Sequence, residues 1–223
     1  MPILETFTSS AVTAFARLMT GVRPDWRGCV PEDRQRIYFA NHASHGDFVL
    51  IWSVLPSELR GRTRPVAGAD YWRQGRLRSF LGTQVFKAVL IERVAENRTQ
   101  DPVAVMAAAL DEGCSLIVFP EGTRNMTDQP LLAFKSGIYN LAAARPAIEL
   151  IPTWIDNLSR VLPKGEFLPL PLLCSVTFGE PLHLQAGEDR LVFLERARQA
   201  LLALSHAATC VEKPGDTHAL HAQ

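Results

Sequence analysis

The residue pair with the clearest chemical potential in this chain is His42 and Asp47, which lie five positions apart in the fragment Asn41-His42-Ala43-Ser44-His45-Gly46-Asp47. An imidazole beside a carboxylate can act as a general base, because the carboxylate orients the ring and stabilises its protonated form. The apolar run 36–40 predicts a buried strand before the pair, and the run 48–52 predicts a helix after it. His42 is therefore expected at a strand-to-helix turn, where open α/β sheets bind their ligands.

A second candidate cluster is the fragment Phe119-Pro120-Glu121-Gly122-Thr123-Arg124, which follows an expected strand at 115–119. Pro120 ends the strand, Gly122 permits a tight bend with exposed backbone N–H groups, and the guanidinium of Arg124 suits phosphate or carboxylate. These features favour an anion site. Taken alone, such a fragment is more often only a turn, in which Glu121 and Arg124 are solvated or paired with each other.

Two further cations are placed where they could reach the same anion. Arg93 ends the segment Val89-Leu90-Ile91-Glu92-Arg93, which predicts a strand that delivers it to the same sheet edge as the first two clusters. Lys135 lies at the start of an expected helix at 134–145, whose positive end also favours anions. An ion pair of Arg93 with a nearby glutamate is the alternative interpretation, but the joint occurrence of all these features is not expected by chance.

Strands and helices are expected to alternate along the chain. Strands are predicted at 36–40, 65–68, 88–91, 115–119, 149–154 and 172–178, and helices from 48 onward and at 71–81, 102–112, 134–145 and 188–204. This alternation predicts an α/β fold with a mixed, largely parallel central sheet flanked by helices.

Length and composition favour one domain with short extensions, because the chain has 223 residues, of which 47% are hydrophobic and 21% charged. We expect an N-terminal amphipathic helix within 1–24, a main domain at 25–204 and a flexible tail at 205–223. Apolar residues recur at helical spacing from Ile3 to Val22. This stripe could pack on the protein's own core or dock on a membrane surface.

The distribution of charges and cysteines bears on which partners the protein could bind and on whether it forms disulfides. The 23 basic and 23 acidic residues balance, which argues against a dedicated nucleic-acid binder. The basic lobe, defined as residues 60–98, contains nine Lys or Arg and three acidic residues. It could face phosphates, an anionic membrane or an acidic carrier protein, or be a solvated face with distant acidic partners. The four widely spaced cysteines predict free thiols, and no run of 18 uninterrupted apolar residues occurs.

The order of these motifs resembles the glycerolipid acyltransferases typified by 1-acylglycerol-3-phosphate acyltransferase. His42 and Asp47 fall on the family's Asn-His-x4-Asp block, and residues 119–124 fall on its Phe-Pro-Glu-Gly-Thr-Arg block. Residues 89–93 match a block that ends in Arg, although the Gly and the aromatic residue that commonly precede this Arg are missing here. Residues 151–154 match a fourth, Val-Pro-like block, so the resemblance covers about residues 36–182.

The resemblance implies a glycerol-3-phosphate acyltransferase-like fold and the transfer of a fatty acyl group to a hydroxyl. His42 would be the base and Asp47 its orienting partner, and acyl-CoA or acyl carrier protein would supply the thioester. The implied acceptor-binding residues are Arg93, Glu121, Gly122, Thr123, Arg124 and Lys135. The favoured acceptor is the lysophospholipid 1-acylglycerol 3-phosphate, which would give phosphatidate. Glycerol 3-phosphate, another lysophospholipid or a lyso-aminolipid are alternative acceptors. Neither a metal nor a further cofactor is implied.

The expected setting is peripheral, on the cytoplasmic face of a membrane, and the apolar clusters at 48–52, 80–86 and 167–173 are candidates to line an acyl groove. A non-catalytic lipid-binding module is the main alternative from another class, but it leaves the His42/Asp47 pair unexplained. A metal-dependent hydrolase using His42, His45 and Asp47 lacks a second ligand cluster, and a serine hydrolase lacks a Gly-x-Ser-x-Gly elbow.

Overall fold

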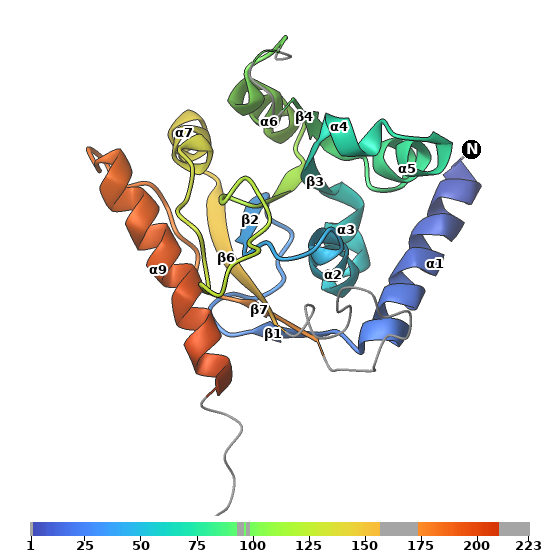
Figure 1. Cartoon of the computed structure of the whole chain (residues 1–223), viewed down its shortest axis with the longest axis horizontal. Helices are drawn as coiled ribbons and strands as arrows, with labels where there is room; N and C mark the ends of the chain where they lie inside the picture. Colours follow the sequence, from blue (N-terminus) through green and yellow to red (C-terminus); the bar gives the residue numbers. More distant parts are fainter. Residues whose placement is uncertain (1, 93–95, 97–98, 157–173, 210–223) are drawn as a thin grey trace, which may run out of the picture.

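A central seven-stranded sheet organises the chain in this computed structural model, which describes residues 2–92, 96, 99–156 and 174–209 (Figure 1). The strand order is β1-β7-β6-β2-β5-β3-β4. The strands are β1 Arg23–Trp26, β2 Arg36–Ala40, β3 Thr63–Gly68, β4 Val89–Ile91, β5 Ser115–Val118, β6 Glu149–Asp156 and β7 Ser175–Phe178. Neighbouring strands pair in parallel except β6 and β7, which are antiparallel. The predicted α/β fold with a mixed, largely parallel sheet is therefore confirmed.

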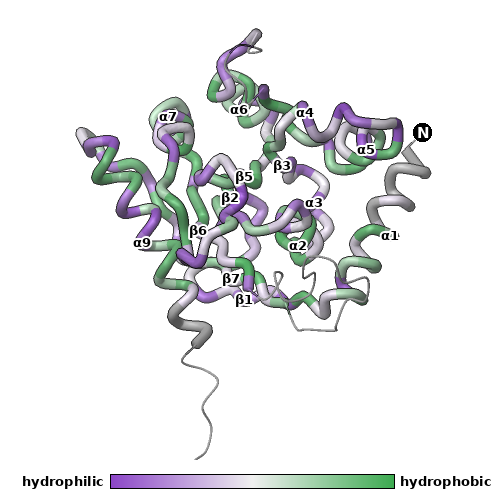
Figure 2. Tube along the Cα trace, in the orientation of Figure 1, coloured by the Kyte–Doolittle hydropathy of each residue, from purple (hydrophilic) through white to green (hydrophobic). Residues whose placement is uncertain are grey.

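Helices cover both faces of this sheet. They are α1 Pro2–Thr20, α2 Asp47–Val54, α3 Ser57–Arg62, α4 Ala69–Trp72, α5 Arg76–Phe80, α6 Pro102–Asp111, α7 Gly137–Ala144 and α9 Arg190–Thr209, with a π-helical turn, η1, at Leu81–Val85. Alternate residues of a strand point to opposite faces. Tyr38 and Ala40 of β2 accordingly join a core with α2 and α4, whereas Ile37 and Phe39 join a core with α6, α7 and α9. Figure 2 shows hydrophilic and hydrophobic residues alternating along α9, as expected for a helix with one buried face.

Three helices differ from their predicted extents. The basic helix expected at 71–81 is divided, because Gly75 adopts a φ of +83° between α4 and α5 and so interrupts the helical backbone. The helix expected from 134 begins at Gly137. The last helix, α9, continues to Thr209. The first residues of the expected tail at 205–223 are therefore helical, and the remainder, 210–223, lies outside the described residues.

Two elements were not predicted. Strand β1 has the sequence Arg-Pro-Asp-Trp, which carries neither an apolar run nor a clear alternation. It forms because it pairs with β7 along its whole length and because Trp26 stacks on Phe178 with ring centroids 3.9 Å apart. Helix α3 is a single short segment in which only Leu59 is buried. Both elements depend on tertiary contacts rather than on a local pattern.

Some predictions fall on residues that the structure does not describe. These are Arg93, residues 172–173 of the strand expected at 172–178, and the apolar cluster at 167–173. The cysteine prediction is confirmed for the described residues, since Cys29, Cys114 and Cys174 are free thiols. None of the helices in the described residues is long and apolar enough to cross a bilayer.

The second half of helix α1 makes polar and apolar contacts with the domain. The Arg17 guanidinium donates two hydrogen bonds, of 3.0 and 2.6 Å, to the carbonyl oxygen of Ser53 near the end of α2. The side of α1 that faces the protein buries Ala16 and Thr20. Phe15 and Leu18, from the predicted apolar stripe, are instead 65% and 82% exposed. These two side chains of the stripe therefore do not pack on the core, whereas Val22, which ends the stripe just after α1, is buried in it.

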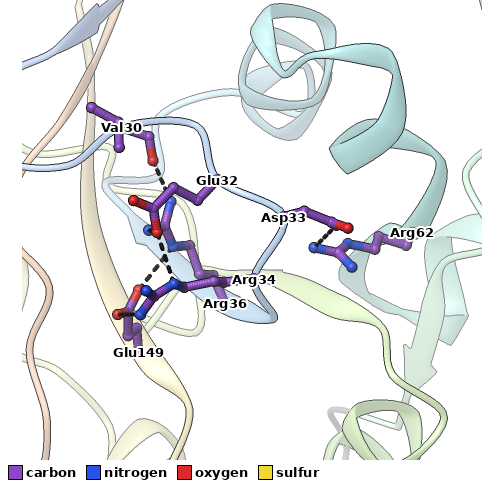
Figure 3. A network of polar contacts seen from close by, with 7 residues as sticks. All are labelled: Val30, Glu32, Asp33, Arg34, Arg36, Arg62 and Glu149. Carbon is purple, nitrogen blue, oxygen red and sulfur yellow. Dashed lines mark hydrogen bonds and ion pairs between the residues drawn. The ribbon is translucent and has the colours of Figure 1, made fainter.

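An ion-pair network fixes the amino-terminal edge of the sheet (Figure 3). Arg36, at the start of β2, is buried and binds the Glu149 carboxylate of β6 at 2.9 Å and the carbonyl oxygen of Val30 at 2.7 Å. Arg34 joins the same carboxylate at 3.5 Å. A buried charge is tolerated when it is paired in this way. The network lies at the start of β2, whereas His42 follows its end, so we assign it to holding β2 and β6 in register.

Candidate active site

His42 and Asp47 form a direct pair at the turn between β2 and α2. Asp47 is the first residue of α2, and its Oδ2 atom accepts hydrogen bonds from His42 Nδ1 at 2.9 Å, from the Ala43 backbone N–H at 2.7 Å and from the Ser44 backbone N–H at 2.9 Å. The side chain is almost fully buried. Because an ionised carboxylate only accepts, Nδ1 carries the proton, which leaves the lone pair of Nε2 available as a base.

The backbone of His42 is also held on both sides. Its N–H donates to Glu121 Oε1 at 2.9 Å, and its carbonyl oxygen accepts from the Asn125 N–H at 2.6 Å. The imidazole stacks on the ring of Phe119, with centroids 4.2 Å apart and planes 19° from parallel. Asn41, one residue earlier, clamps the Ile155 backbone with its side-chain amide at 3.0 and 2.8 Å. The turns after β2 and β5 therefore form one interlocked unit.

The turn after β5 requires the glycine that the sequence places there. Gly122 has a φ of +68°, and its N–H donates to the Phe119 carbonyl oxygen at 2.9 Å. A Cβ atom at this position would lie 2.8 Å from Lys135 Cδ. Lys135 thus folds over the turn, and its N–H is bonded to the Pro120 carbonyl oxygen at 2.8 Å. The turn and the ammonium group of Lys135 are brought together as predicted.

A cavity of about 440 Å³ opens beside His42 at the carboxyl ends of β2, β3 and β5. This volume is within the range of small-molecule sites. Polar lining groups include His42, His45, Gly122, Lys135, Ser136 and Asn140, together with the two acidic residues Glu92 and Asp101. Apolar lining groups come from Phe48, Val66, Trp72, Val103, Met106 and Leu141. The cavity could therefore hold an amphiphilic molecule with its reacting atoms near His42.

The remaining predicted site residues do not line the cavity in the described part of the structure. Thr123 and Arg124 are exposed and do not belong to the cavity lining. Arg93 lies outside the described residues. Glu121 is 2% exposed and sits beneath the turn, also outside the lining. Burial raises the pKa of the Glu121 carboxyl, and the hydrogen bonds from Leu132 and His42 partly offset this rise.

Several lining residues were not predicted, because they come from elements with no local chemical signal. Tyr71 of α4 stacks on His45 with ring centroids 4.5 Å apart, and the Arg78 guanidinium lies 4.7 Å from the centre of the same Tyr71 ring. Val103 and Met106 come from α6. Of the expected acyl-groove clusters, 48–52 contributes Phe48, whereas 80–86 contributes Phe86 to the core rather than to the cavity.

The basic lobe is partly neutralised by acids, two from elsewhere in the chain and one, Glu92, from the lobe itself. Arg62 pairs with Asp33 at 2.5 Å, and Arg64 pairs with Glu112 at 2.9 Å. Arg73 pairs with Glu92 at 2.6 Å. Among the described residues, no group of three or more His, Cys, Asp or Glu comes together as a metal-binding set.

A covered, largely parallel sheet with a His/Asp pair beside a mixed polar and apolar cavity is an α/β arrangement suited to general-base chemistry on an amphiphilic molecule. The acyltransferase family matches residues 27–156, more than half of the chain. The chain therefore belongs to the acyltransferase family, as its motifs predicted.

Known proteins similar to this chain agree with that assignment. A 1-acyl-sn-glycerol-3-phosphate acyltransferase of Chlamydomonas reinhardtii is 25% identical over 177 residues, which make up 77% of this chain and 48% of that protein. The chain thus spans about half the length of that relative. The crystal structure of the 1-acyl-sn-glycerophosphate (LPA) acyltransferase PlsC from Thermotoga maritima superposes with a TM-score of 0.69 and 18% identity, covering 95% of this chain and 83% of PlsC. This likeness confirms the fold.

Proposed function

We propose that this protein is an O-acyltransferase that moves a fatty acyl group from a thioester to the free hydroxyl of a lysophospholipid, with 1-acylglycerol 3-phosphate as the favoured acceptor. The observation that carries the proposal is the His42–Asp47 pair, hydrogen-bonded at 2.9 Å, beside a cavity lined by both polar and apolar groups. Membership of the acyltransferase family and the names of the two relatives support it.

The proposed chemistry uses His42 as a general base. Its Nε2 atom removes the proton from the acceptor hydroxyl while the hydroxyl oxygen attacks the thioester carbonyl carbon. The new C–O bond forms, the C–S bond breaks, and the departing thiolate takes a proton from the imidazolium. Asp47 holds the ring in the required tautomer and stabilises its positive charge. The acyl group passes directly to the acceptor, so no acyl-enzyme is needed.

The proposed acceptor site is built around the turn after β5. Lys135, on the cavity wall, supplies a positive charge for the glycerol phosphate beside the Gly122 turn. Arg124 and Thr123, exposed at the rim, would contact the phosphate from the solvent side, and Arg93 remains a predicted fourth contributor. The acyl chain would occupy the apolar part of the cavity between α6 and α7, against Val103, Met106 and Leu141.

We also propose that the protein works as a peripheral enzyme on the cytoplasmic face of a membrane. A lysophospholipid acceptor resides in a lipid surface, so the enzyme must meet that surface. The exposed Phe15 and Leu18 side chains on α1 are suited to insert among lipid tails, as in an interfacial amphipathic helix. Acyl-CoA and acyl carrier protein are both retained as donors.

The activity test is thiol release from a long-chain acyl-CoA and, in parallel, from acyl carrier protein, with and without 1-acylglycerol 3-phosphate. The variant is His42→Ala, and the matched control is His183→Ala, which removes an exposed imidazole far from the cavity. Acceptor-dependent release that is lost only in His42→Ala supports the proposal. Release independent of the acceptor indicates a thioesterase, and no release with any donor or acceptor favours a lipid-binding module.

A further inference from the structure

The hydrogen bonds of Glu121 differ from those expected of a residue that binds the acyl acceptor. Each of its carboxylate oxygens accepts a backbone hydrogen bond of 2.9 Å, Oε1 from His42 and Oε2 from Leu132. The side chain is buried and lies outside the cavity lining. Both oxygens are thus engaged with the protein's own backbone, outside the lining of the cavity in which an acyl acceptor would bind.

The two ends of this bridge have different surroundings. Leu132 follows Leu131, which is 1% exposed and packs in the core with α6 and α7, so the Oε2 end is fixed to the interior. His42 is the residue whose ring must be held in place. The second hydrogen bond to its backbone, from Asn125, comes from the same turn as Glu121. Glu121 therefore ties the His42 peptide to a rigid part of the core.

A carboxylate is the group that can make this bridge. It offers an acceptor to both N–H donors at once, whereas the amide of glutamine offers one oxygen and turns an NH₂ donor toward the second N–H. Aspartate is one methylene shorter and cannot span both donors in the same position. Burying a charge is costly unless it is hydrogen-bonded, which these two donors provide. The protein keeps a buried carboxylate where it holds the peptide of the proposed base.

We propose that Glu121 is a positioning residue for His42: it holds the histidine backbone so that Nε2 faces the cavity, and it is not a ligand of the acceptor. This inference rests on the proposed function for the role of His42 in catalysis. The geometric part, the bridge from Leu132 to His42, can be tested in the absence of any substrate.

The kinetic test compares Glu121→Gln with wild type, and uses Glu188→Gln as the matched control. Glu188 is also a hydrogen-bonded carboxylate, bound to Arg196 at 2.7 Å at the start of α9, away from the cavity. A base displaced by a fraction of an ångström transfers protons poorly, so kcat of Glu121→Gln should fall by about 10- to 100-fold. Its KM for 1-acylglycerol 3-phosphate should stay within about twofold. A raised KM with unchanged kcat would overturn the inference in favour of acceptor binding.

The second test reads the geometry directly by NMR. In Glu121→Gln, amide hydrogen exchange at His42 and Leu132 should accelerate and the resonance of the His42 Nδ1 proton should move, while Glu188→Gln leaves all three unchanged. Unchanged exchange and resonance in Glu121→Gln would refute the positioning role. If wild type shows no transfer with any donor or acceptor, the proposed function fails, and the exchange data still decide the bridge. If Glu121→Gln does not fold, the same measurements on Glu121→Asp decide the question, with the same expected changes.

Discussion

The change Asp47→Asn separates the charge of Asp47 from its geometry. Asp47 Oδ2 accepts three hydrogen bonds, two of them from the Ala43 and Ser44 backbone N–H groups. These N–H donors require an oxygen at the Oδ2 position, so the asparagine amide is held with its oxygen toward His42. Oδ1 has no hydrogen-bonding partner among the described residues, so the new NH₂ group displaces no existing bond. His42 should therefore keep its tautomer and lose only the negative charge beside it.

The size of the effect follows from that lost charge. Imidazolium and carboxylate centres about 4 Å apart interact by about 4 kcal/mol at the effective dielectric constant of a protein surface. Each 1.4 kcal/mol, approximately, corresponds to a factor of ten in rate, and the amide dipole retains part of the interaction. We expect kcat to fall by about 10²- to 10³-fold. Neutral acceptors make weaker hydrogen bonds than carboxylates, so the free energy of unfolding should fall by about 1–3 kcal/mol.

The assay is acceptor-dependent thiol release at saturating substrates, combined with urea unfolding followed by tryptophan fluorescence. Asp111→Asn is the matched control, since Asp111 pairs with Arg145 at the end of α6 and is exposed. Asp47→Ala leaves the Ala43 and Ser44 N–H groups without their acceptor and should cost a further 1–3 kcal/mol, approximately, for each. A kcat for folded Asp47→Asn within about threefold of wild type would refute the assignment of His42 and Asp47 as a catalytic pair.

Three further outcomes are expected. Gly122→Ala should lower the free energy of unfolding by about 1–2 kcal/mol, because alanine is strained at a φ of +68° and its Cβ would displace Lys135. Urea unfolding measures the loss of stability, and the KM for the acyl acceptor measures the displacement of Lys135. Wild-type values for both would contradict this prediction. Phe15→Glu with Leu18→Glu should reduce binding to anionic vesicles by at least about tenfold without changing the melting temperature, because both side chains are exposed. The control is Leu191→Glu, at an exposed side chain of α9, and retained vesicle binding in the double variant would exclude α1 as the docking element. The hydrogen bonds from Arg196 lower the pKa of Glu188, so the ionised Glu188 stabilises the fold above the ordinary glutamate pKa of about 4.3, and this contribution is lost as the pH falls through the lowered pKa of the folded state. The difference in unfolding free energy between wild type and Glu188→Gln should therefore be largest near neutral pH and vanish in strong acid. A difference that grows in acid would contradict the lowered pKa.

Much of the sheet was predictable because its strands are buried on both faces. Residues 37–40 and 116–118 are continuous apolar runs, which is the pattern of central strands in a parallel sheet. Residues 150–155 of β6 are all buried as well, although Pro152 and Thr153 interrupt their apolar run. Strand β1 could not be predicted, since its four residues acquire their conformation from β7 and from the Trp26–Phe178 stack. Gly75 was visible in the sequence, but its left-handed conformation, which divides α4 from α5, was not.

The amino-acid sequence alone is almost enough to place the His42 imidazole beside the Asp47 carboxylate. His42 and Asp47 are five residues apart across one tight turn, so their contact is local and their spacing almost specifies it. The tertiary structure decided what surrounds that pair. It placed the Glu121 carboxylate outside the cavity lining, hydrogen-bonded to the backbone of His42 and Leu132, and it brought Val103 and Met106 of α6 together with Leu141 of α7 in the cavity wall. These placements depend on contacts between residues far apart in the chain, and such contacts are fixed by packing against the sheet rather than by any local pattern.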